Sequence, residues 1–227
     1  MSKSKFAYDE GDVAGLIVTD AEDSASPSEP RSLARPEMLA RRRGMLDSPH
    51  ILPLRDYALE LRSEGRGFVP DLDPMDGGIE ARFLFLLEKP GPMTDPARTG
   101  KPGSGFVSRD NDDPTAAAIF SFMQQAAIPR KETVIWNTIP WWNGVTDISG
   151  REWPDGLARL EGLMTLLPKL EAAVLIGRKA QRARRLLEAK GLAVWASAHP
   201  SPRVKAGHPA LYRAIPEIWA EAARGHV

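Results

Sequence analysis

Three polar side chains suited to hydrolytic chemistry follow short apolar runs in this sequence. Glu88 comes directly after residues 83–87, Asn137 follows residues 133–136, and His199 stands two small residues after 192–196. Short apolar runs of this kind favour strands that are buried on both faces, as in a parallel sheet. Ligands bind beyond the carboxyl ends of such strands. The spacing therefore predicts that the chemistry of this chain lies at those strand ends.

Each of the three side chains has a chemical use and a plainer alternative. The Glu88 carboxylate, followed by a turn at Pro90 and Gly91, suits the orientation or activation of water, or forms only an incidental Glu–Lys pair. The Asn137 amide offers the donor and the acceptor that O4 and N3–H of uracil require, or caps a turn. His199, held before a proline, suits donation to an oxygen that gains negative charge, or is a structural histidine.

Two loops complete the set of candidate residues. A Gly/Pro-rich loop at residues 99–109 would bring backbone amides and the Phe106 ring to a flat ligand, although Phe106 suits a buried plug equally well. This loop lacks the pattern of a phosphate-binding loop. After His199 comes a stiff segment that suits contact with a DNA backbone, followed by two cations: Pro200, Ser201, Pro202, Arg203 and Lys205.

In this order, the segments resemble the motifs of the uracil-DNA glycosylase superfamily. Residues 88–91 are similar to Gly-Glu-Ala-Pro-Gly of the bacterial and archaeal iron–sulfur class, and Phe106-Val107 to its Pro-Phe-Val-Gly segment. Asn137 matches the base-reading asparagine, and residues 199–202 match the second catalytic motif, His-Pro-Ser-Pro. Residues 71–78 resemble the segment before the first strand in these proteins. The resemblance covers about residues 68–224.

The resemblance implies hydrolysis of the N-glycosidic bond of uracil, or of a related deaminated base, in DNA. Glu88 would position or deprotonate water, and His199 would stabilise O2 of the leaving base. Asn137 would select uracil, and Phe106 would stack on the flipped base, an interaction worth about 1–3 kcal/mol. Pro90 and Gly91 would line the base pocket. No metal or organic cofactor is implied, and we expect a monomer with DNA as its partner.

Two departures from the family motif leave other functions open. Leu87 stands where the family has glycine, and Lys89 where it has alanine or asparagine, so a cation next to the catalytic water would alter water activation or base choice. The chain then resembles a non-catalytic nucleic-acid-binding relative, or a glycosylase for hypoxanthine or xanthine. A small-molecule hydrolase unrelated to DNA would leave the basic C-terminal end unused.

Helical patterns between the apolar runs predict the elements that position these loops. Apolar periodicity and capping residues favour helices at residues 36–43, 54–62, 115–126, 157–167 and 179–189, and a last helix that reaches residue 223. Asp113 and Asp155 are the expected N-caps of the third and fourth of these. The alternation predicts an α/β fold with a mostly parallel sheet. The family resemblance implies a three-layer α/β/α sandwich around four strands.

The composition limits the number of domains and the kinds of site that the chain can form. The 227 residues suit a single folded domain at residues 36–227, preceded by a flexible arm at residues 1–35 that is rich in Ser, Pro and acidic residues. With 30 basic and 30 acidic residues, the chain as a whole does not attract polyanions, although its basic residues gather after residue 176. The absence of cysteine excludes disulfides, thiolate zinc sites and cysteine-ligated iron–sulfur clusters, so packing must hold the N-terminal region. Without a spanning segment or a secretory signal, we expect a cytoplasmic protein with no membrane contact.

Overall fold

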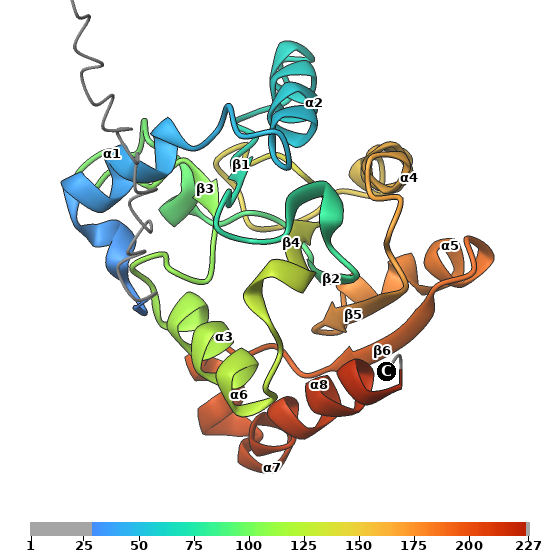
Figure 1. Cartoon of the computed structure of the whole chain (residues 1–227). Helices are drawn as coiled ribbons and strands as arrows, with labels where there is room; N and C mark the ends of the chain where they lie inside the picture. Colours follow the sequence, from blue (N-terminus) through green and yellow to red (C-terminus); the bar gives the residue numbers. More distant parts are fainter. Residues whose placement is uncertain (1–28, 226–227) are drawn as a thin grey trace, which may run out of the picture.

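A four-stranded parallel sheet forms the centre of the computed structural model, which describes residues 29–225 (Figure 1). Its strands are β2 (Phe83–Leu87), β4 (Thr133–Asn137), β5 (Ala172–Ile176) and β6 (Ala193–Ser197), in the order β4-β2-β5-β6. Every neighbouring pair is parallel. The α/β class and the parallel four-stranded sheet predicted from the sequence are therefore confirmed, and each strand lies within one residue of its predicted run.

Helices cover both faces of this sheet. Figure 1 shows α2 (Leu52–Ser63) and α4 (Glu152–Thr165) on one face, and α3 (Pro114–Gln125) and α8 (Ile215–Arg224) on the other. The remaining elements lie around these layers: 3-10 helices η1 (Ser32–Ala34), η2 (Gly78–Glu80), η3 (Pro92–Thr94), η4 (Arg130–Glu132) and η5 (Ala180–Ala183), and helices α1 (Pro36–Gly44), α5 (Arg184–Ala189), α6 (Pro202–Gly207) and α7 (Pro209–Arg213).

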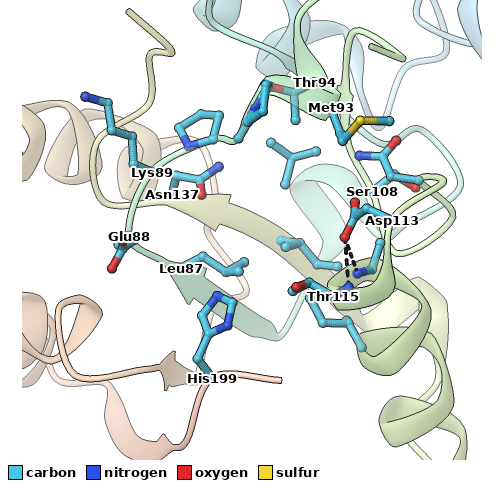
Figure 2. Close-up of a pocket in the computed structure, with 18 of the residues that line it drawn as sticks. Leu87, Glu88, Lys89, Met93, Thr94, Ser108, Asp113, Thr115, Asn137 and His199 are labelled. Carbon is cyan, nitrogen blue, oxygen red and sulfur yellow. Dashed lines mark hydrogen bonds between the residues drawn. The ribbon is translucent and has the colours of Figure 1, made fainter. Parts of the chain in front are cut away.

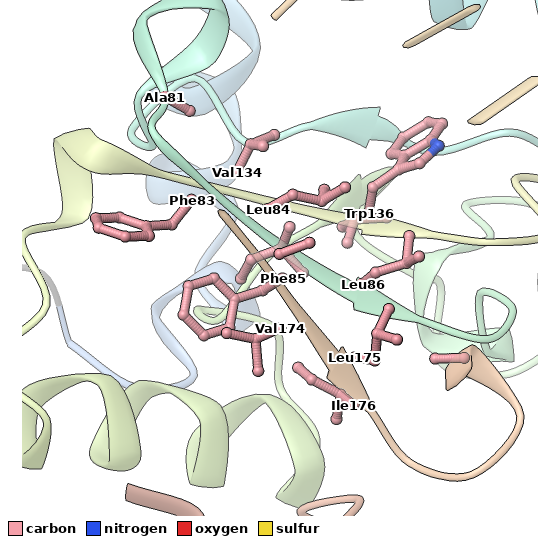
Figure 3. Close-up of a cluster of buried hydrophobic side chains, with 14 of the residues drawn as sticks. Ala81, Phe83, Leu84, Phe85, Leu86, Val134, Trp136, Val174, Leu175 and Ile176 are labelled. Atoms are coloured by element: carbon pink, nitrogen blue, oxygen red, sulfur yellow. The ribbon is translucent and has the colours of Figure 1, made fainter. Parts of the chain in front are cut away.

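Alternation along the strands divides the core between the two helical layers. Phe85 packs edge-to-face on Trp219 of α8, with ring centroids 5.0 Å apart, and Trp219 in turn contacts Phe122 of α3. Figure 3 shows Leu84, Leu86 and Trp136 on the opposite side of β2 and β4. All of these side chains are at most 7% exposed. Burial on both faces explains why β2 consists of five consecutive apolar residues.

The structure tests the predicted N-caps of two helices. Asp113 caps α3 as predicted, since its Oδ1 accepts hydrogen bonds from the N–H groups of Thr115 and Ala116 at 2.9 Å. The predicted cap Asp155 is wrong, because α4 begins three residues earlier, at Glu152, and Asp155 lies within its first turn. There Asp155 forms an ion pair with Arg66 instead.

A second, two-stranded sheet lies outside the predicted strands, and one of its strands is at the end of the Gly/Pro-rich loop. β1 (Asp71–Leu72) pairs in parallel with β3 (Phe106–Val107). This pairing fixes the end of the Gly/Pro-rich loop against the segment that precedes β2. Residues 29–35, the last part of the predicted arm, are folded, with Ser32 and Leu33 buried. Residues 1–28 of that arm lie outside the described residues.

A buried cluster of charges holds the N-terminal region to the rest of the fold. It consists of three arginines and three aspartates, here called the Arg–Asp cluster: Arg42, Arg109, Arg130, Asp73, Asp76 and Asp110. Their side chains are between 0% and 14% exposed. The cluster joins α1, the segments at 71–76 and 108–110, and η4. The prediction that packing alone holds the N-terminal region therefore needs correction, because ion pairs contribute.

Arg130 is the central member of the Arg–Asp cluster. Its guanidinium lies 2.8 Å from a carboxylate oxygen of each of the three aspartates, Asp73, Asp76 and Asp110. Arg42 adds a second cation for Asp73 and for Asp110. Burial raises the pKa of Asp76 to about 6, against the opposing effect of the nearby arginines, so this carboxyl is the least well compensated.

Replacing Arg130 with methionine should destabilise the fold strongly. R130M leaves buried carboxylates without their main counter-charge, which typically costs about 3–5 kcal/mol. The free energy of unfolding, measured in urea, checks this. The matched control is R224Q, which breaks an ion pair whose side chains are 63% and 69% exposed and should cost less than about 1 kcal/mol. Equal effects of the two substitutions would contradict a structural role for the cluster.

Candidate active site

A cavity of about 410 Å³ lies at the carboxyl ends of β2 and β4, bounded by the loop after β2 and the first turn of α3 (Figure 2). Of the candidate site residues, Glu88, Pro90, Gly91, Asn137 and His199 line it, and so do the two departures from the family motif, Leu87 and Lys89. They come from three strand ends that are separated by up to 111 positions in the chain. The cavity is therefore the place where the predicted residues meet.

Backbone hydrogen bonds fix the end of β2, where Glu88 stands. The N–H of Thr138 donates to the Leu87 carbonyl at 2.8 Å, and the N–H of Ile139 donates to the Glu88 carbonyl at 2.8 Å. The Glu88 carboxylate is 30% exposed and lies 3.1 Å from the Nζ of Lys179, which follows β5. This ion pair holds the carboxylate at the rim of the cavity, where water has access.

Asn137 is the last residue of β4 and lies beside Leu87 of β2. It is only 3% exposed and lines the cavity. Within residues 29–225, its side-chain amide forms no hydrogen bond, and the amide atoms keep some accessible surface. A buried amide without a protein partner is costly unless water or a ligand satisfies it. Asn137 is therefore placed to recognise a ligand through one donor and one acceptor.

His199 reaches the cavity from the segment after β6, and neighbouring groups hold that segment in place. The Ser197 hydroxyl accepts a hydrogen bond of 3.0 Å from the indole N–H of Trp219, and the Gly177 N–H donates to the Ser197 carbonyl at 2.9 Å. Gly177 has φ +87°, and a Cβ there would lie 3.3 Å from the His199 Cβ. Glycine at 177 thus satisfies both the turn and the approach of His199.

The charge state of His199 follows from its surroundings. Burial lowers the pKa of His199, and the negative charges of Glu88 and Asp113 only partly oppose this effect. The ring is therefore neutral at neutral pH, with one N–H donor. A neutral imidazole suits donation to an oxygen that becomes negative during a reaction.

Lys89, the main departure from the family motif, is one of the residues that line the cavity, but its amine points away from it. Its side chain is 2% exposed, and its Nζ lies 3.0 Å from Glu152 Oε1 and 3.4 Å from the Asp147 carbonyl. Figure 2 shows the amine turned away from Asn137 and His199. Glu152 of α4 neutralises the Lys89 charge outside the cavity. The expected direct effect of this cation on water beside Glu88 is therefore not supported.

Phe106 is not among the residues that line the cavity. It is 1% exposed, and its place in β3 leaves the neighbouring Val107 facing the cavity instead. The carbonyl of Phe106 accepts a hydrogen bond from the Asn111 amide at 2.9 Å, and its N–H donates to the Ser104 hydroxyl at 3.0 Å. In this structure the Phe106 ring therefore does not face the cavity, contrary to the first expectation. It is a buried side chain, as the alternative predicted.

The first turn of α3 supplies cavity residues that sequence reasoning missed. Asp113 and Thr115 line the cavity opposite Asn137, together with Ser108 and Met93 from the preceding loops (Figure 2). Asp113 was expected only as a helix cap. The signal that would have identified it is position, since a helix that starts at the carboxyl edge of a sheet points its first turn at the ligand site.

The segment after His199 divides into buried and exposed residues. Pro200 is buried, and the Ser201 hydroxyl accepts a hydrogen bond from the Val204 N–H at 3.4 Å as the N-cap of α6. Pro202, Arg203 and Lys205 are exposed. The exposed members are the ones available to a partner such as a DNA backbone.

The described residues provide no candidate metal centre and no membrane span. Between residues 29 and 225, no group of three or more His, Asp or Glu side chains is arranged to hold a metal ion. Over the same range, none of the helices is both long and apolar enough to cross a membrane.

The fold and the cavity together define an open α/β protein with a ligand site at the carboxyl edge of its parallel sheet. The sequence matches no family model and no curated protein. Similar solved structures include a variant of the mimivirus UNG in complex with UGI, at 18% identity, covering 74% of this chain and 71% of that chain, with a TM-score of 0.39. Another is UNG of Nitratifractor salsuginis, at 16% identity, covering 85% of this chain and 98% of that chain, with a TM-score of 0.38. Both are uracil-DNA glycosylases, the superfamily that the sequence motifs resemble.

The pair formed by Lys89 and Glu152 predicts a defined dependence of stability on pH. Burial tends to raise the pKa of Glu152, but hydrogen bonds from the Ser149 N–H, Lys89 and Trp141 outweigh it and lower the pKa to about 2. A carboxyl with a lowered pKa stabilises the fold above its unfolded pKa of about 4.5 and loses this contribution as the pH falls towards 2.

The substitution E152Q should therefore destabilise the fold by about 3 kcal/mol at pH 7, because Lys89 stays buried without its counter-charge. The difference from the unsubstituted chain should shrink as the pH falls from 4.5 to 2. Urea unfolding across this range measures both effects. The double substitution K89M/E152Q should recover most of the loss, and a double variant as unstable as E152Q would refute the pairing.

Proposed function

We propose that this chain is an N-glycosylase that removes uracil, or a related deaminated base, from DNA. The observation that carries the proposal is the meeting of Glu88, Asn137 and His199 in one cavity at the strand ends. A carboxylate for water, an amide that both donates and accepts, and a neutral imidazole donor are the groups that this hydrolysis requires.

Each group has a distinct task in the proposed reaction. The Asn137 amide reads the base, with its N–H₂ donating to a carbonyl such as O4 and its oxygen accepting from N3–H. His199 donates a hydrogen bond to O2, which gains negative charge as the glycosidic bond breaks. Glu88 orients the water that attacks C1′ of the sugar and accepts its proton. A lost donor to such an oxyanion typically costs on the order of 3 kcal/mol in transition-state stabilisation.

The base has to leave the duplex to reach this cavity. Flipping costs a few kcal/mol and is easiest for a mismatched base such as uracil opposite guanine. Exposed Arg203 and Lys205 lie after the His199 segment, where bonds to phosphate would hold the strand without reading its sequence. Exposed Pro202 in the same segment would press on the backbone. Since Phe106 is buried, the apolar contacts of the base fall to Pro90, Gly91 and Met93.

Base release from oligonucleotides tests the proposal. Single-stranded DNA and duplexes with one uracil opposite guanine or adenine are compared with hypoxanthine and xanthine substrates, under single-turnover conditions. We expect the unsubstituted chain to release uracil and H199A to release it about 100- to 1000-fold more slowly, while DNA binding is retained. N137A should lose preference for uracil over cytosine.

The matched control is H208A, which removes an exposed histidine nine positions after His199 and outside the cavity. H208A should release uracil at the unsubstituted rate. Binding of DNA without release of any of the three bases would contradict the proposal and favour a non-catalytic binding protein. Release that is unchanged in H199A would refute the role of His199.

A further inference from the structure

We propose that Asp113 is a second carboxylate of the reaction, which stabilises the positive charge that develops on the deoxyribose as the base leaves. This inference deepens the proposed glycosylase function and rests on it. Asp113 stands at the start of α3 and lines the cavity, opposite the strand ends that carry Glu88 and Asn137 (Figure 2).

The two oxygens of the Asp113 carboxylate have different environments. Oδ1 accepts hydrogen bonds of 2.9 Å from the N–H groups of Thr115 and Ala116, which orient the side chain. Among the residues that the structure describes, Oδ2 has no hydrogen-bond partner and no cation within ion-pair distance. The cap thus fixes the carboxylate while one oxygen stays available to whatever fills the cavity. The unpartnered amide of Asn137, 3% exposed, independently marks the same cavity as a ligand site.

Asp113 and Glu88 both act on the imidazole of His199. Each negative charge raises the pKa of His199, against the larger opposite effect of burial. A cavity with two carboxylates is unfavourable for phosphate groups, which would therefore stay outside it. It is favourable for a group that becomes positive inside it. In the cleavage of an N-glycosidic bond, that group is the sugar ring.

The steps balance without any further reactant. The bond between C1′ and the base nitrogen breaks, and its electron pair leaves with the base, whose anion accepts a hydrogen bond from His199. The ring oxygen and C1′ share the resulting positive charge, which Asp113 stabilises without forming a bond. The oxygen of water then bonds to C1′, and the proton of that water passes to Glu88. The base anion takes a proton from solvent, and Glu88 releases its proton to solvent, which restores the carboxylate.

Two substitutions at Asp113 test this role without removal of the helix cap. In D113N the amide oxygen still caps α3 while the charge is lost, and in D113S the hydroxyl caps the helix while the second oxygen is lost. We expect both variants to release uracil about 100-fold more slowly in a single turnover. Both should bind a duplex with a non-hydrolysable 2′-fluoro-deoxyuridine about twofold more tightly, because a negative charge near the phosphates is gone.

Slower cleavage combined with tighter binding separates charge stabilisation from a structural defect, which would weaken both. The control is D112N, which removes the neighbouring charge that pairs with Lys101 and Arg31 outside the cavity. D112N should release uracil at the unsubstituted rate. The thermal unfolding midpoint of each variant, within a few degrees of the unsubstituted protein, verifies that the cap is retained.

The outcomes separate this inference from the proposed function. Release by D113N and D113S within threefold of the unsubstituted rate overturns the role of Asp113 and leaves the glycosylase function intact. Slower release together with equally weakened DNA binding also overturns it, because Asp113 is then structural. An unsubstituted chain that releases no base from any substrate overturns the proposed function, and the role of Asp113 with it.

Discussion

The Arg–Asp cluster, three arginines and three aspartates, is buried behind one wall of the cavity. The position of that wall depends on the cluster. Arg130 contacts all three aspartates, and the segment at residues 108–110 lies between this cluster and the cavity. Charges in a low-dielectric interior are stable only when each is compensated. Because α1, the segment that follows β1 and η4 all contribute, none of these segments can move without leaving a charge uncompensated in apolar surroundings.

The opposite wall of the cavity depends on the parallel sheet. In parallel strands the carboxyl ends lie side by side, so residues far apart in the chain meet. Hydrogen bonds from residues 138 and 139 to the end of β2 hold Glu88 and Asn137 in a fixed relation. The cavity thus lies between a rigid strand edge and a wall anchored by ion pairs. Such preorganisation would keep the donors and carboxylates of the proposed site in place before a ligand binds.

The sequence predicts the sheet well because its signals are local. Five consecutive apolar residues mark β2, and the polar residue at each strand end follows directly from the strand assignment. The two-stranded sheet of β1 and β3 escapes prediction, since two residues carry no periodicity and depend on a partner more than thirty positions away. The start of α4 escapes it as well, because Glu152 is fixed by the distant Lys89. Tertiary contacts decide both cases.

The same distinction applies to the site. Glu88, Asn137 and His199 are predicted from position and from motif resemblance, whereas the direction of a side chain is not in the sequence. Lys89 turns to Glu152 and Phe106 turns into the protein, each because of partners that only the fold brings near. Asp113 is recognisable as a helix cap from the sequence alone. Its presence in the cavity follows from where α3 begins relative to the sheet.

The most direct test of this account is a crystal structure of the chain bound to a duplex that contains 2′-fluoro-deoxyuridine opposite guanine. The fluorine disfavours positive charge on the sugar, so the bond to the base should stay intact. The account predicts that the base lies outside the helix, in the cavity, with its O2 near His199 and its N3–H and O4 at the Asn137 amide. A base that stays stacked in the duplex, or one that is bound away from these two residues, would contradict it.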